Sequence, residues 1–428
     1  MDLAPIRALL ARAGNPEREL RCIHVAGSKG KGSVSLFCEA ILQECGLRVG
    51  TFTSPHLARW TERFRLAGRE VEGPALARAV ERLRPEIEAL RAQGGPEPSF
   101  FDATTAAALL LFREARVDAA VLEVGLGGRL DSTNAVLPAV GCIASIELEH
   151  TDKLGSTLAA IAAEKAGIAK PGVPLVVGPL PAEALEVVES RARELAAPVS
   201  RLGRELAAEC LEERVDSQRV RIRDGALALE CELSAAGAHQ PGNAALAFAC
   251  ARRAGLRSDA ELLAAARRAL PRAILPARIE WLSRAPAVIV DSAHTRVSAR
   301  ELARVLARIP RRRSHLVLSI SAGKDVAGIL EALLPQADLV SLTRAEATRS
   351  LSADEVAAAV RAAAPALELR VIPNPHLALR AAREALAPGD LLVATGSVYL
   401  AGIAREILRA GDLAQQVAVA RSAGRSER

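Results

Sequence analysis

The chain has 428 residues, of which half are hydrophobic and a quarter are charged, and its formal net charge is +6. This length exceeds one ordinary hydrophobic core, so we expect two domains. The composition suits a soluble globular protein, no apolar run is long enough to span a bilayer, and the N-terminus lacks the pattern of a signal peptide. We therefore expect a cytoplasmic protein without a membrane association.

The positive charge is compatible with nucleic-acid binding, but its distribution argues against that class. Arginines are spread along amphipathic segments among acidic residues, and aromatic residues that would stack on bases make up only 2% of the chain. The one tight basic run, Arg311 to Arg313, is typical of a solvated surface turn. Seven scattered cysteines, never spaced as CxxC, indicate neither a disulfide framework nor a zinc site. We expect no nucleic-acid partner.

Lysine is rare in this chain. Of the 56 basic residues only six are lysines. They are Lys29, Lys31, Lys153, Lys165, Lys170 and Lys324. Because arginine supplies the generic surface charge, a retained lysine suggests a need for a compact ammonium or a reactive amine.

Predicted strands and helices alternate through the first part of the chain. Buried apolar runs predict strands at residues 22–26, 49–53, 119–124, 141–146 and 174–177. Segments with helical spacing lie between several of them, which predicts right-handed βαβ units around a mainly parallel sheet. Residues 220–233 alternate around Asp224-Gly225 and predict an antiparallel hairpin attached to that sheet.

The alternation restarts after Pro271 and Pro276. Strands are predicted at residues 287–290, 316–319, 338–342, 369–372 and 391–395. We therefore predict one α/β domain over residues 1–275 and a second over residues 276–428. The tail 421–428 is expected to be disordered.

A glycine-rich loop, Gly27-Ser28-Lys29-Gly30-Lys31-Gly32-Ser33, follows the first predicted strand and precedes a helix. Glycines let backbone N–H groups converge on phosphate oxygens, and the helix N-terminus adds positive potential. Lys31 is placed to reach the β- and γ-phosphates of a nucleotide. The loop is shorter than the GxxxxGK[ST] form, and the alternative is a glycine turn without a ligand. The flanking strand and helix favour a phosphate site.

Two later strands are also followed by candidate functional residues. Glu123 lies at the end of the strand at 119–124. A carboxylate in this position, beside a phosphate loop, is typical of a Mg²⁺ ligand. The alternative is an acid that only caps the glycine turn after the strand. His150 follows the strand at 141–146 and is a candidate second ligand, although a lone histidine is more often structural. Lys165 lies on the next helix, where spacing alone favours a surface ion pair.

Together with further motifs, these segments resemble the folylpolyglutamate synthase/dihydrofolate synthase family of the Mur ligase superfamily. The ordered set of motifs runs almost from end to end. It comprises GSKGKGS (27–33), TSPHL (53–57), FFDATT (100–105), LEVGLGGRLDSTN (122–134), HTD (150–152), EKAGI (164–168), HQPGNA (239–244), PARIE (276–280), DSAH (291–294), GKD (323–325) and TGSVYL (395–400). The resemblance implies a P-loop Mur-ligase-type ATPase domain, with a mainly parallel sheet, a small antiparallel sheet and the folate site. A Rossmann-like α/β glutamate ligase domain would follow it.

Carried over residue by residue, the resemblance implies four sets of site residues. ATP would be bound by Gly27, Ser28, Lys29, Gly30, Lys31, Gly32, Ser33, Asn243, Arg278 and Asp291. Mg²⁺ would be bound by Ser54, Glu123 and His150. The folate or pterin substrate would contact Ser99, Phe100, Phe101, Asp102, Leu130, Asp131 and Ser132. The catalytic residues would be Lys31, His150, Arg278 and Lys165, and the lysine matching Lys165 is carbamylated in the family.

The implied activity is an ATP-dependent, Mg²⁺-requiring ligase. It would join L-glutamate to dihydropteroate, to a reduced folate or to both, through an acyl phosphate, and it would act as a monomer. One alternative is a Mur-type ligase for a different carboxylate and amino acid. Another is a catalytically silent ATP-binding paralogue.

Three features depart from the family pattern. The family usually has Asp-Gly-Ala-His-Asn-Pro where residues 291–296 read Asp-Ser-Ala-His-Thr-Arg, and it usually has Glu at the position of Asp102. The first predicted strand begins at residue 22, whereas relatives usually carry an additional N-terminal helix and loop that help to bind the pterin. Either the start is truncated or misassigned, or the substrate is recognised differently here.

Overall fold

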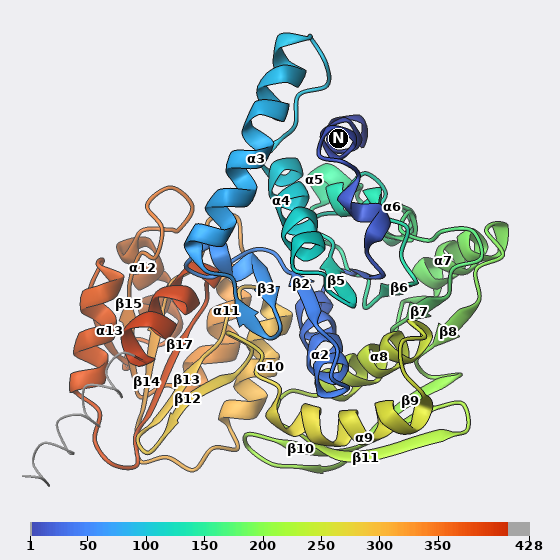
Figure 1. Cartoon of the computed structure of the whole chain (residues 1–428). Helices are drawn as coiled ribbons and strands as arrows, with labels where there is room; N and C mark the ends of the chain where they lie inside the picture. Colours follow the sequence, from blue (N-terminus) through green and yellow to red (C-terminus); the bar gives the residue numbers. More distant parts are fainter. Residues whose placement is uncertain (1, 410–428) are drawn as a thin grey trace, which may run out of the picture. The chain divides into compact units, whose positions relative to one another are not determined.

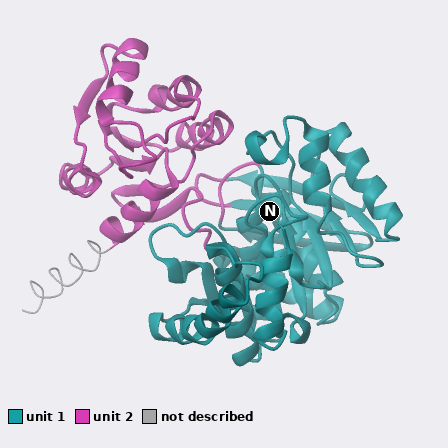
Figure 2. Ribbon diagram, turned by 90° about the horizontal axis from the view of Figure 1, so that it is seen from above, with its two compact units in different colours: residues 1–213, 218–234, 239–273 teal, residues 214–217, 235–238, 274–428 magenta. Residues whose placement is uncertain are grey.

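A computed structural model describes residues 2–409 of the chain, so the predicted tail 421–428 lies outside the described residues. The fold separates into two compact units (Figure 2). Unit 1 comprises residues 1–213, 218–234 and 239–273. Unit 2 comprises residues 214–217, 235–238 and 274–428. Each unit is described by itself below.

An eight-stranded sheet forms the centre of unit 1 (Figure 1), in the order β4-β3-β2-β5-β1-β6-β7-β8. The strands are β1 (Cys22–Ala26), β2 (Val49–Phe52), β3 (Phe64–Leu66), β4 (Arg69–Glu70), β5 (Ala119–Glu123), β6 (Val140–Ile143), β7 (Leu175–Val177) and β8 (Val199–Arg201). Strands β3 and β4 are antiparallel and the others are parallel. Every residue of β1, β2, β5, β6 and β7 is buried, as expected of parallel strands covered on both faces. The predicted mainly parallel sheet is confirmed.

Helices cover the sheet of unit 1 with their apolar faces. Helices α1 (Ala4–Arg12), α3 (Gly73–Ala92) and α4 (Phe100–Glu114) share one buried cluster with β2 and β5. Helices α6 (Leu158–Ala166) and α7 (Ala182–Glu194) share another with β6 and β7. Helix α2 (Lys31–Glu44) packs against α8 (Gln240–Arg253) and α9 (Asp259–Ala269), and α5 (Thr151–Leu154) is a single turn. The segment before β1 thus contains a helix, α1, that joins the core.

The predicted hairpin exists as β10 (Gln218–Asp224) and β11 (Leu227–Leu233), but its attachment to the main sheet was predicted wrongly. The free edge of β10 pairs with β9 (Leu206–Glu213), which makes a separate antiparallel sheet in the order β11-β10-β9. Sequence reasoning missed β9 because it is acidic and mostly half-buried or exposed, with no buried apolar run.

Unit 2 is built on a six-stranded sheet in the order β12-β13-β17-β14-β15-β16. Its strands are β12 (Glu280–Arg284), β13 (Ala287–Val290), β14 (Ser314–Leu318), β15 (Leu339–Leu342), β16 (Glu368–Val371) and β17 (Leu391–Thr395). Only β12 runs antiparallel to its neighbour. Its helices include α10 (Arg296–Leu306), α11 (Val326–Leu333), α12 (Ala353–Ala363) and α13 (Pro375–Glu384), and residues 398–409 are also helical. The predicted α/β fold of this part is confirmed, although β12 was not predicted.

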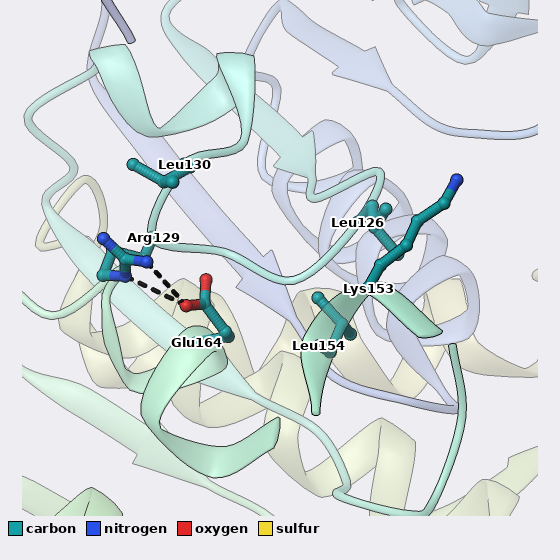
Figure 3. Close-up of a pocket in the computed structure, with 6 residues that line it drawn as sticks. All are labelled: Leu126, Arg129, Leu130, Lys153, Leu154 and Glu164. Carbon is teal, nitrogen blue, oxygen red and sulfur yellow. Dashed lines mark hydrogen bonds and ion pairs between the residues drawn. The ribbon is translucent and has the colours of Figure 1, made fainter. Parts of the chain in front are cut away.

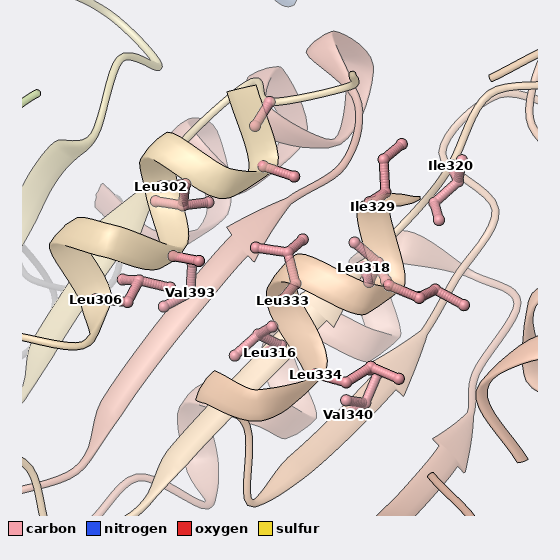
Figure 4. Close-up of a cluster of buried hydrophobic side chains, with 14 of the residues drawn as sticks. Leu302, Leu306, Leu316, Leu318, Ile320, Ile329, Leu333, Leu334, Val340 and Val393 are labelled. Atoms are coloured by element: carbon pink, nitrogen blue, oxygen red, sulfur yellow. The ribbon is translucent and has the colours of Figure 1, made fainter. Parts of the chain in front are cut away.

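The core of unit 2 lies between this sheet and its helices (Figure 4). Leu302 and Leu306 of α10 and Leu333 of α11 point toward strand residues such as Leu316 and Val393. The basic run beside this core is engaged in pairing, because Arg312 contacts Asp390 at 3.0 Å and Arg313 pairs with Glu368. Among residues 2–409, no helix combines the length and apolarity that crossing a membrane requires.

Candidate functional site

The glycine-rich loop connects β1 to α2 and is shaped by Gly30. This residue is the N-cap of α2 with a φ of 83°, a left-handed conformation that glycine adopts without strain. A Cβ atom at Gly30 would lie 2.7 Å from Oδ1 of Asn243 on α8. The structure therefore brings two of the predicted ATP-binding segments into contact, and only glycine fits between them.

The segment after β6 holds the loop in place. The Lys29 N–H donates to the Ser145 hydroxyl at 2.8 Å, and the Ser28 N–H donates to the Ser145 carbonyl at 2.8 Å. The Glu147 N–H donates to the Ser28 hydroxyl at 2.9 Å. Because these bonds connect two strand ends, the loop conformation is set before any ligand arrives.

The ammonium of Lys31 folds back over this loop. It donates to the carbonyl oxygens of Gly27 at 2.6 Å and Ser28 at 3.3 Å. Both acceptors are neutral, and a charged phosphate oxygen is a stronger acceptor for an ammonium. Lys31 is therefore positioned to exchange these bonds for contacts with a phosphate group.

Glu123 and Ser54 lie together beside the loop. Glu123 is the last residue of β5 and is 5% exposed, and the Ser54 N–H donates to its Oε2 at 3.1 Å. A Cβ on Gly32 would lie 3.7 Å from both carboxylate oxygens of Glu123. Two of the three predicted Mg²⁺ ligands are thus adjacent to the helix that the loop begins.

His150 lies beyond the end of β6, the other strand that flanks β1. It is exposed, has a left-handed φ of 47° and is the N-cap of α5. Parallel strands β5 and β6 end at the same edge of the sheet, so Glu123 and His150 belong to that edge. Within residues 2–409, no three His, Cys, Asp or Glu side chains form a group suited to a metal ion.

Lys165 is buried, in contrast to the surface position that its spacing favours. The residue is 1% exposed, and its ammonium lies 3.2 Å from Oε1 of Glu149. Burial, reinforced by the positive charge of Lys31, lowers the pKa of Lys165 to about 8, although Glu149 acts in the opposite direction. An amine with this pKa is neutral in roughly a tenth of the molecules at pH 7.

Glu149 is a site residue that sequence reasoning missed as an individual. Burial raises the pKa of Glu149, but the positive charges of Lys31, Lys165 and Lys29 outweigh it and leave the pKa below its ordinary value. The ammonium of Lys29 lies 3.7 Å from Glu149 Oε2. The available signal was its place directly before His150, at a strand end that faces a lysine-rich loop.

The two predicted substrate segments meet at Asp102. Ser99 caps α4, and Asp102 Oδ2 accepts bonds from the Ser99 N–H at 2.8 Å and from its hydroxyl at 2.6 Å. The other oxygen, Oδ1, accepts the Ser132 hydroxyl at 2.6 Å. Asp102 therefore fixes the start of α4 against the short helix η3 (Ser132–Ala135).

Asp131 shapes the glycine turn after β5. It is buried, and it accepts the Leu126 N–H at 2.9 Å and the Thr133 hydroxyl at 2.5 Å. Burial raises the pKa of Asp131, while these hydrogen bonds work in the opposite direction. The Thr133 hydroxyl also contacts Nε2 of the buried His24 at 2.8 Å, so this turn is tied to β1.

An aromatic surface lies next to these segments. Phe100 is 62% exposed, with the Trp60 ring centroid 5.6 Å away and the Arg63 guanidinium 5.9 Å above its ring. Phe101 packs against Gly125, where a Cβ would lie 2.5 Å from the ring. Such a surface suits a planar aromatic ligand. Sequence reasoning missed Trp60 and Arg63, for which the signal was their place just after TSPHL.

The predicted ATP-binding residues of unit 2 form a tight turn of their own. Asp291 is buried and accepts the Ile279 N–H at 2.8 Å and the Ala293 N–H at 2.7 Å. Burial raises the pKa of Asp291, and the backbone bonds and Arg278 oppose it. The Arg278 guanidinium bonds to the Ser292 hydroxyl and to the Ala277 carbonyl at 3.1 Å. Asp291 and Arg278 are therefore neighbours within this unit.

A pocket of about 270 Å³ opens beside the glycine turn after β5 (Figure 3). Its lining consists of Leu126, Arg129, Leu130, Lys153, Leu154 and Glu164. Arg129 pairs with Glu164 at 2.7 Å, across the pocket from the aliphatic stem of Lys153.

Family models match both parts of the chain. The Mur ligase middle domain matches residues 25–251, and the glutamate ligase domain of Mur ligases matches residues 277–398. The dihydrofolate synthase/folylpolyglutamate synthase of Bacillus subtilis is 35% identical, with 77% of this chain and 78% of that protein covered. A crystal structure of the Mycobacterium tuberculosis folylpolyglutamate synthase complexed with ADP and AMPPCP has a TM-score of 0.86 and 32% identity. It covers 95% of each chain.

One of the curated relatives is about twice as long as this chain. A probable bifunctional folylpolyglutamate synthase/dihydropteroate synthase of Haloferax volcanii is 36% identical over 94% of this chain. The chain spans about half the length of that protein, since the match covers 47% of it. The phosphate loop, the strand-end carboxylate and the buried lysine stand in the motifs that carry the resemblance, and relatives of similar length match throughout. The chain therefore belongs to the folylpolyglutamate synthase/dihydrofolate synthase family of the Mur ligase superfamily.

Proposed function

We propose that the chain is an ATP-dependent ligase that joins the amino group of L-glutamate to the carboxylate of dihydropteroate, of a reduced folate or of both. A carboxylate is a poor electrophile toward amines, so the reaction uses ATP to form an acyl phosphate. The glutamate amine attacks that acyl phosphate, and ADP and phosphate are released. The activity is cytoplasmic, and the ligase works as a monomer.

The observation that carries this proposal is the convergence of the phosphate loop and the strand-end carboxylate. Lys31 lies over the loop, and Glu123 lies beside Gly32 on the same helix N-terminus. Gly27, Ser28, Lys29, Gly30, Gly32 and Ser33 provide the phosphate cradle, and Lys31 stabilises charge on the transferring phosphoryl group. Asn243, which touches Gly30, contacts the adenine side.

The residues beside the loop fit a Mg²⁺ site. The buried Glu123 carboxylate, the Ser54 hydroxyl and His150 belong to one sheet edge. The first two offer the hard oxygen donors that suit this ion, and His150 would add an imidazole nitrogen. Bound Mg²⁺ neutralises charge on the phosphate oxygens. The Ser54 backbone N–H donates to the Glu123 side-chain carboxylate, which orients that carboxylate before the ion binds.

Lys165 is proposed to carry a carbamate. Carbon dioxide reacts with the neutral amine, and the lowered pKa supplies that form near pH 8. Carbamylation converts a cation next to Glu149 into an anion, which supports a further Mg²⁺ ion. Mass spectrometry of protein in bicarbonate, with Lys165→Ala as the control, is expected to find the added carbamate only in the wild type after chemical trapping.

The remaining residues are assigned to the acceptor and to unit 2. Phe100, Phe101 and Leu130 provide the walls for the pterin or folate, while Ser99, Asp102, Asp131 and Ser132 fix those walls in place. Arg278 and Asp291, in the glutamate ligase domain, contact the phosphates and ribose of ATP. In this proposal residues 1–275 form the ATP-binding domain, which also contains the folate site. Residues 276–428 form the glutamate ligase domain.

The test is ADP release by the purified protein with MgATP and L-glutamate, with dihydropteroate, tetrahydrofolate or no acceptor. We expect turnover that depends on the acceptor, and a product heavier by one glutamyl unit in the mass spectrum. Turnover only with other carboxylates would identify a different Mur-type ligase. Tight ATP binding without turnover on any acceptor would identify a silent paralogue.

A further inference from the structure

The pocket beside the glycine turn contains an uncompensated positive charge. Two of its lining residues, Arg129 and Glu164, neutralise each other, with both Nε and Nη2 of Arg129 within 3.1 Å of Glu164 Oε1. Lys153 is the remaining charged residue of the lining. Among residues 2–409, its ammonium makes no hydrogen bond and no ion pair with another side chain. The pocket thus has a net charge of +1.

The shape of the lining favours an anion with an apolar body. Leu126, Leu130 and Leu154 form the walls, and the ammonium of Lys153 extends from its rim (Figure 3). The leucines contact hydrocarbon or aryl surface without a polar cost, and the ammonium pairs with an acid at the opening. A carboxylate-bearing organic molecule matches both features.

The pocket shares one lining residue, Leu130, with the proposed acceptor site. Leu130 is the first residue of the segment Leu130 to Ser132, and Glu164 directly precedes the buried Lys165. Gly128 brings the turn against the helix, because a Cβ there would lie 2.8 Å from the Glu164 carbonyl. An acceptor that packs against Leu130 therefore also borders the pocket that Lys153 lines.

We propose that Lys153 binds the α-carboxylate of a glutamyl residue already present on the acceptor, and so favours glutamylated folates over dihydropteroate. This inference rests on the proposed ligase function. Dihydropteroate has a single carboxylate, which is the reacting group. A folate with one glutamyl residue reacts through its γ-carboxylate and keeps its α-carboxylate free, so only that acceptor offers a second anion to Lys153.

Steady-state kinetics of Lys153→Met with both acceptors test the inference. The KM for tetrahydrofolate should rise about fivefold, the size of a partly exposed ion pair, while kcat and the KM for dihydropteroate stay unchanged. Lys153→Arg should restore the wild-type KM because it keeps the charge. Arg78→Met, which removes an exposed cation from α3, should change neither acceptor.

A binding measurement separates this inference from the ligase proposal. Calorimetry compares p-aminobenzoyl-L-glutamate, which carries the additional α-carboxylate, with p-aminobenzoate, and it requires no turnover. We expect Lys153→Met to weaken only the first compound. An equal change for both compounds, an unchanged affinity for both, or no binding of either by the wild type would overturn the role of Lys153. Absence of turnover on every acceptor, with the binding difference intact, would overturn the ligase proposal alone.

Discussion

Two turns of the molecule, the phosphate loop of unit 1 and the Arg278 turn of unit 2, reach unusual backbone conformations by different means. In the loop, the left-handed position is a glycine, Gly30, with a φ of 83°. In the turn, Ala277 and Ile279 have φ values of 53° and 47° although both carry a Cβ. A β-branched residue with positive φ is strained, and such strain persists only where its surroundings impose it.

The surroundings that impose the second turn are visible. The buried Asp291 carboxylate accepts the Ile279 N–H, and the Ser292 N–H donates to the Ala277 carbonyl at 3.0 Å. The left-handed residue of the loop is thus accommodated because it lacks a Cβ, whereas the left-handed residues of the turn are held by hydrogen bonds with Asp291 and Ser292. This difference teaches that mutations should affect the two regions through different quantities: ligand chemistry in the loop and folding stability in the turn.

The largest expected effect is on catalysis at the loop. Lys31→Met should lower kcat for ADP release about a thousandfold, because the charge that we propose to stabilise the transferring phosphoryl group is lost. Lys29→Met is the matched control, since its half-exposed ammonium faces Glu149 and its loss should cost about tenfold at most. Equal losses in the two variants would show that Lys31 has no special place over the loop.

The next effect is on the stability of unit 2. Asp291→Ala should lower its free energy of unfolding by about 3 kcal/mol, because two buried N–H groups lose their acceptor. Asp291→Asn keeps one acceptor oxygen and should lose about half as much. Urea unfolding followed by Trp281 fluorescence in a Trp60→Phe background reports on unit 2, since Trp281 lies on β12. Unchanged stability would contradict the role of Asp291 in imposing the turn.

A third expected effect is the loss of stability of each unit at acid pH. Each has a buried histidine on a central strand, bonded through Nε2 to a hydroxyl at 2.8 Å: His24 to Thr133, and His315 to Ser341. Burial, helped by nearby positive charges, lowers the pKa of His24 to about 3 and that of His315 to about 4.

Because the unfolded histidines bind protons near pH 6.5, stability should fall as the pH drops below that value and continue to fall to the folded pKa. Between pH 7 and pH 5 each histidine should cost about 2 kcal/mol. Urea unfolding at both pH values, with His24→Gln and His315→Gln, measures this cost in its own unit. If a variant loses as much stability between pH 7 and pH 5 as the wild type, the replaced histidine does not cause that loss.

The smallest effects come from replacing the left-handed glycine of the loop by alanine and a left-handed alanine of the turn by glycine. Gly30→Ala should weaken ATP binding about tenfold, since it combines a left-handed φ with a Cβ too close to Asn243. Ala277→Gly should change the unfolding free energy by less than about 1 kcal/mol, because relieved strain offsets a lost buried methyl group and added chain entropy. Calorimetric titration with ATP and urea unfolding measure the two outcomes. A large loss in Ala277→Gly would mean that the turn is unstrained.

The parts of the fold that sequence predicted are those with a strong local signal. Strands β1, β13 and β17 have the predicted bounds because each is a short, continuous apolar run. Strand β9 has no such run, and β12 ends in Ser283 and Arg284, which are not typical of a buried strand. Pairing of the hairpin with β9 rather than the main sheet depends on tertiary packing, which periodicity does not encode.

The candidate site likewise contains features that the sequence predicted and features that it did not. The phosphate loop and Glu123 were identified from glycine spacing and from the acid at a strand end, and the contact of Glu123 with Ser54 agrees with their shared assignment. Neither the burial of Lys165 nor its pairing with Glu149 follows from helix spacing, because the two residues meet only when α6 packs on the sheet edge. Roles carried over from the family motifs stay predictions until ligands are bound.

The two short segments of unit 2 that interrupt unit 1 in sequence have a consequence for dissecting this protein. Asp216 pairs with Arg284, the Ala238 N–H donates to Glu301 at 2.6 Å, and Ala236 belongs to the buried cluster of unit 2. A fragment expressed from residue 274 onward would lack all three. Such a fragment should be prone to aggregation, and supplying residues 214–238 as a fused or separate peptide is expected to rescue its solubility.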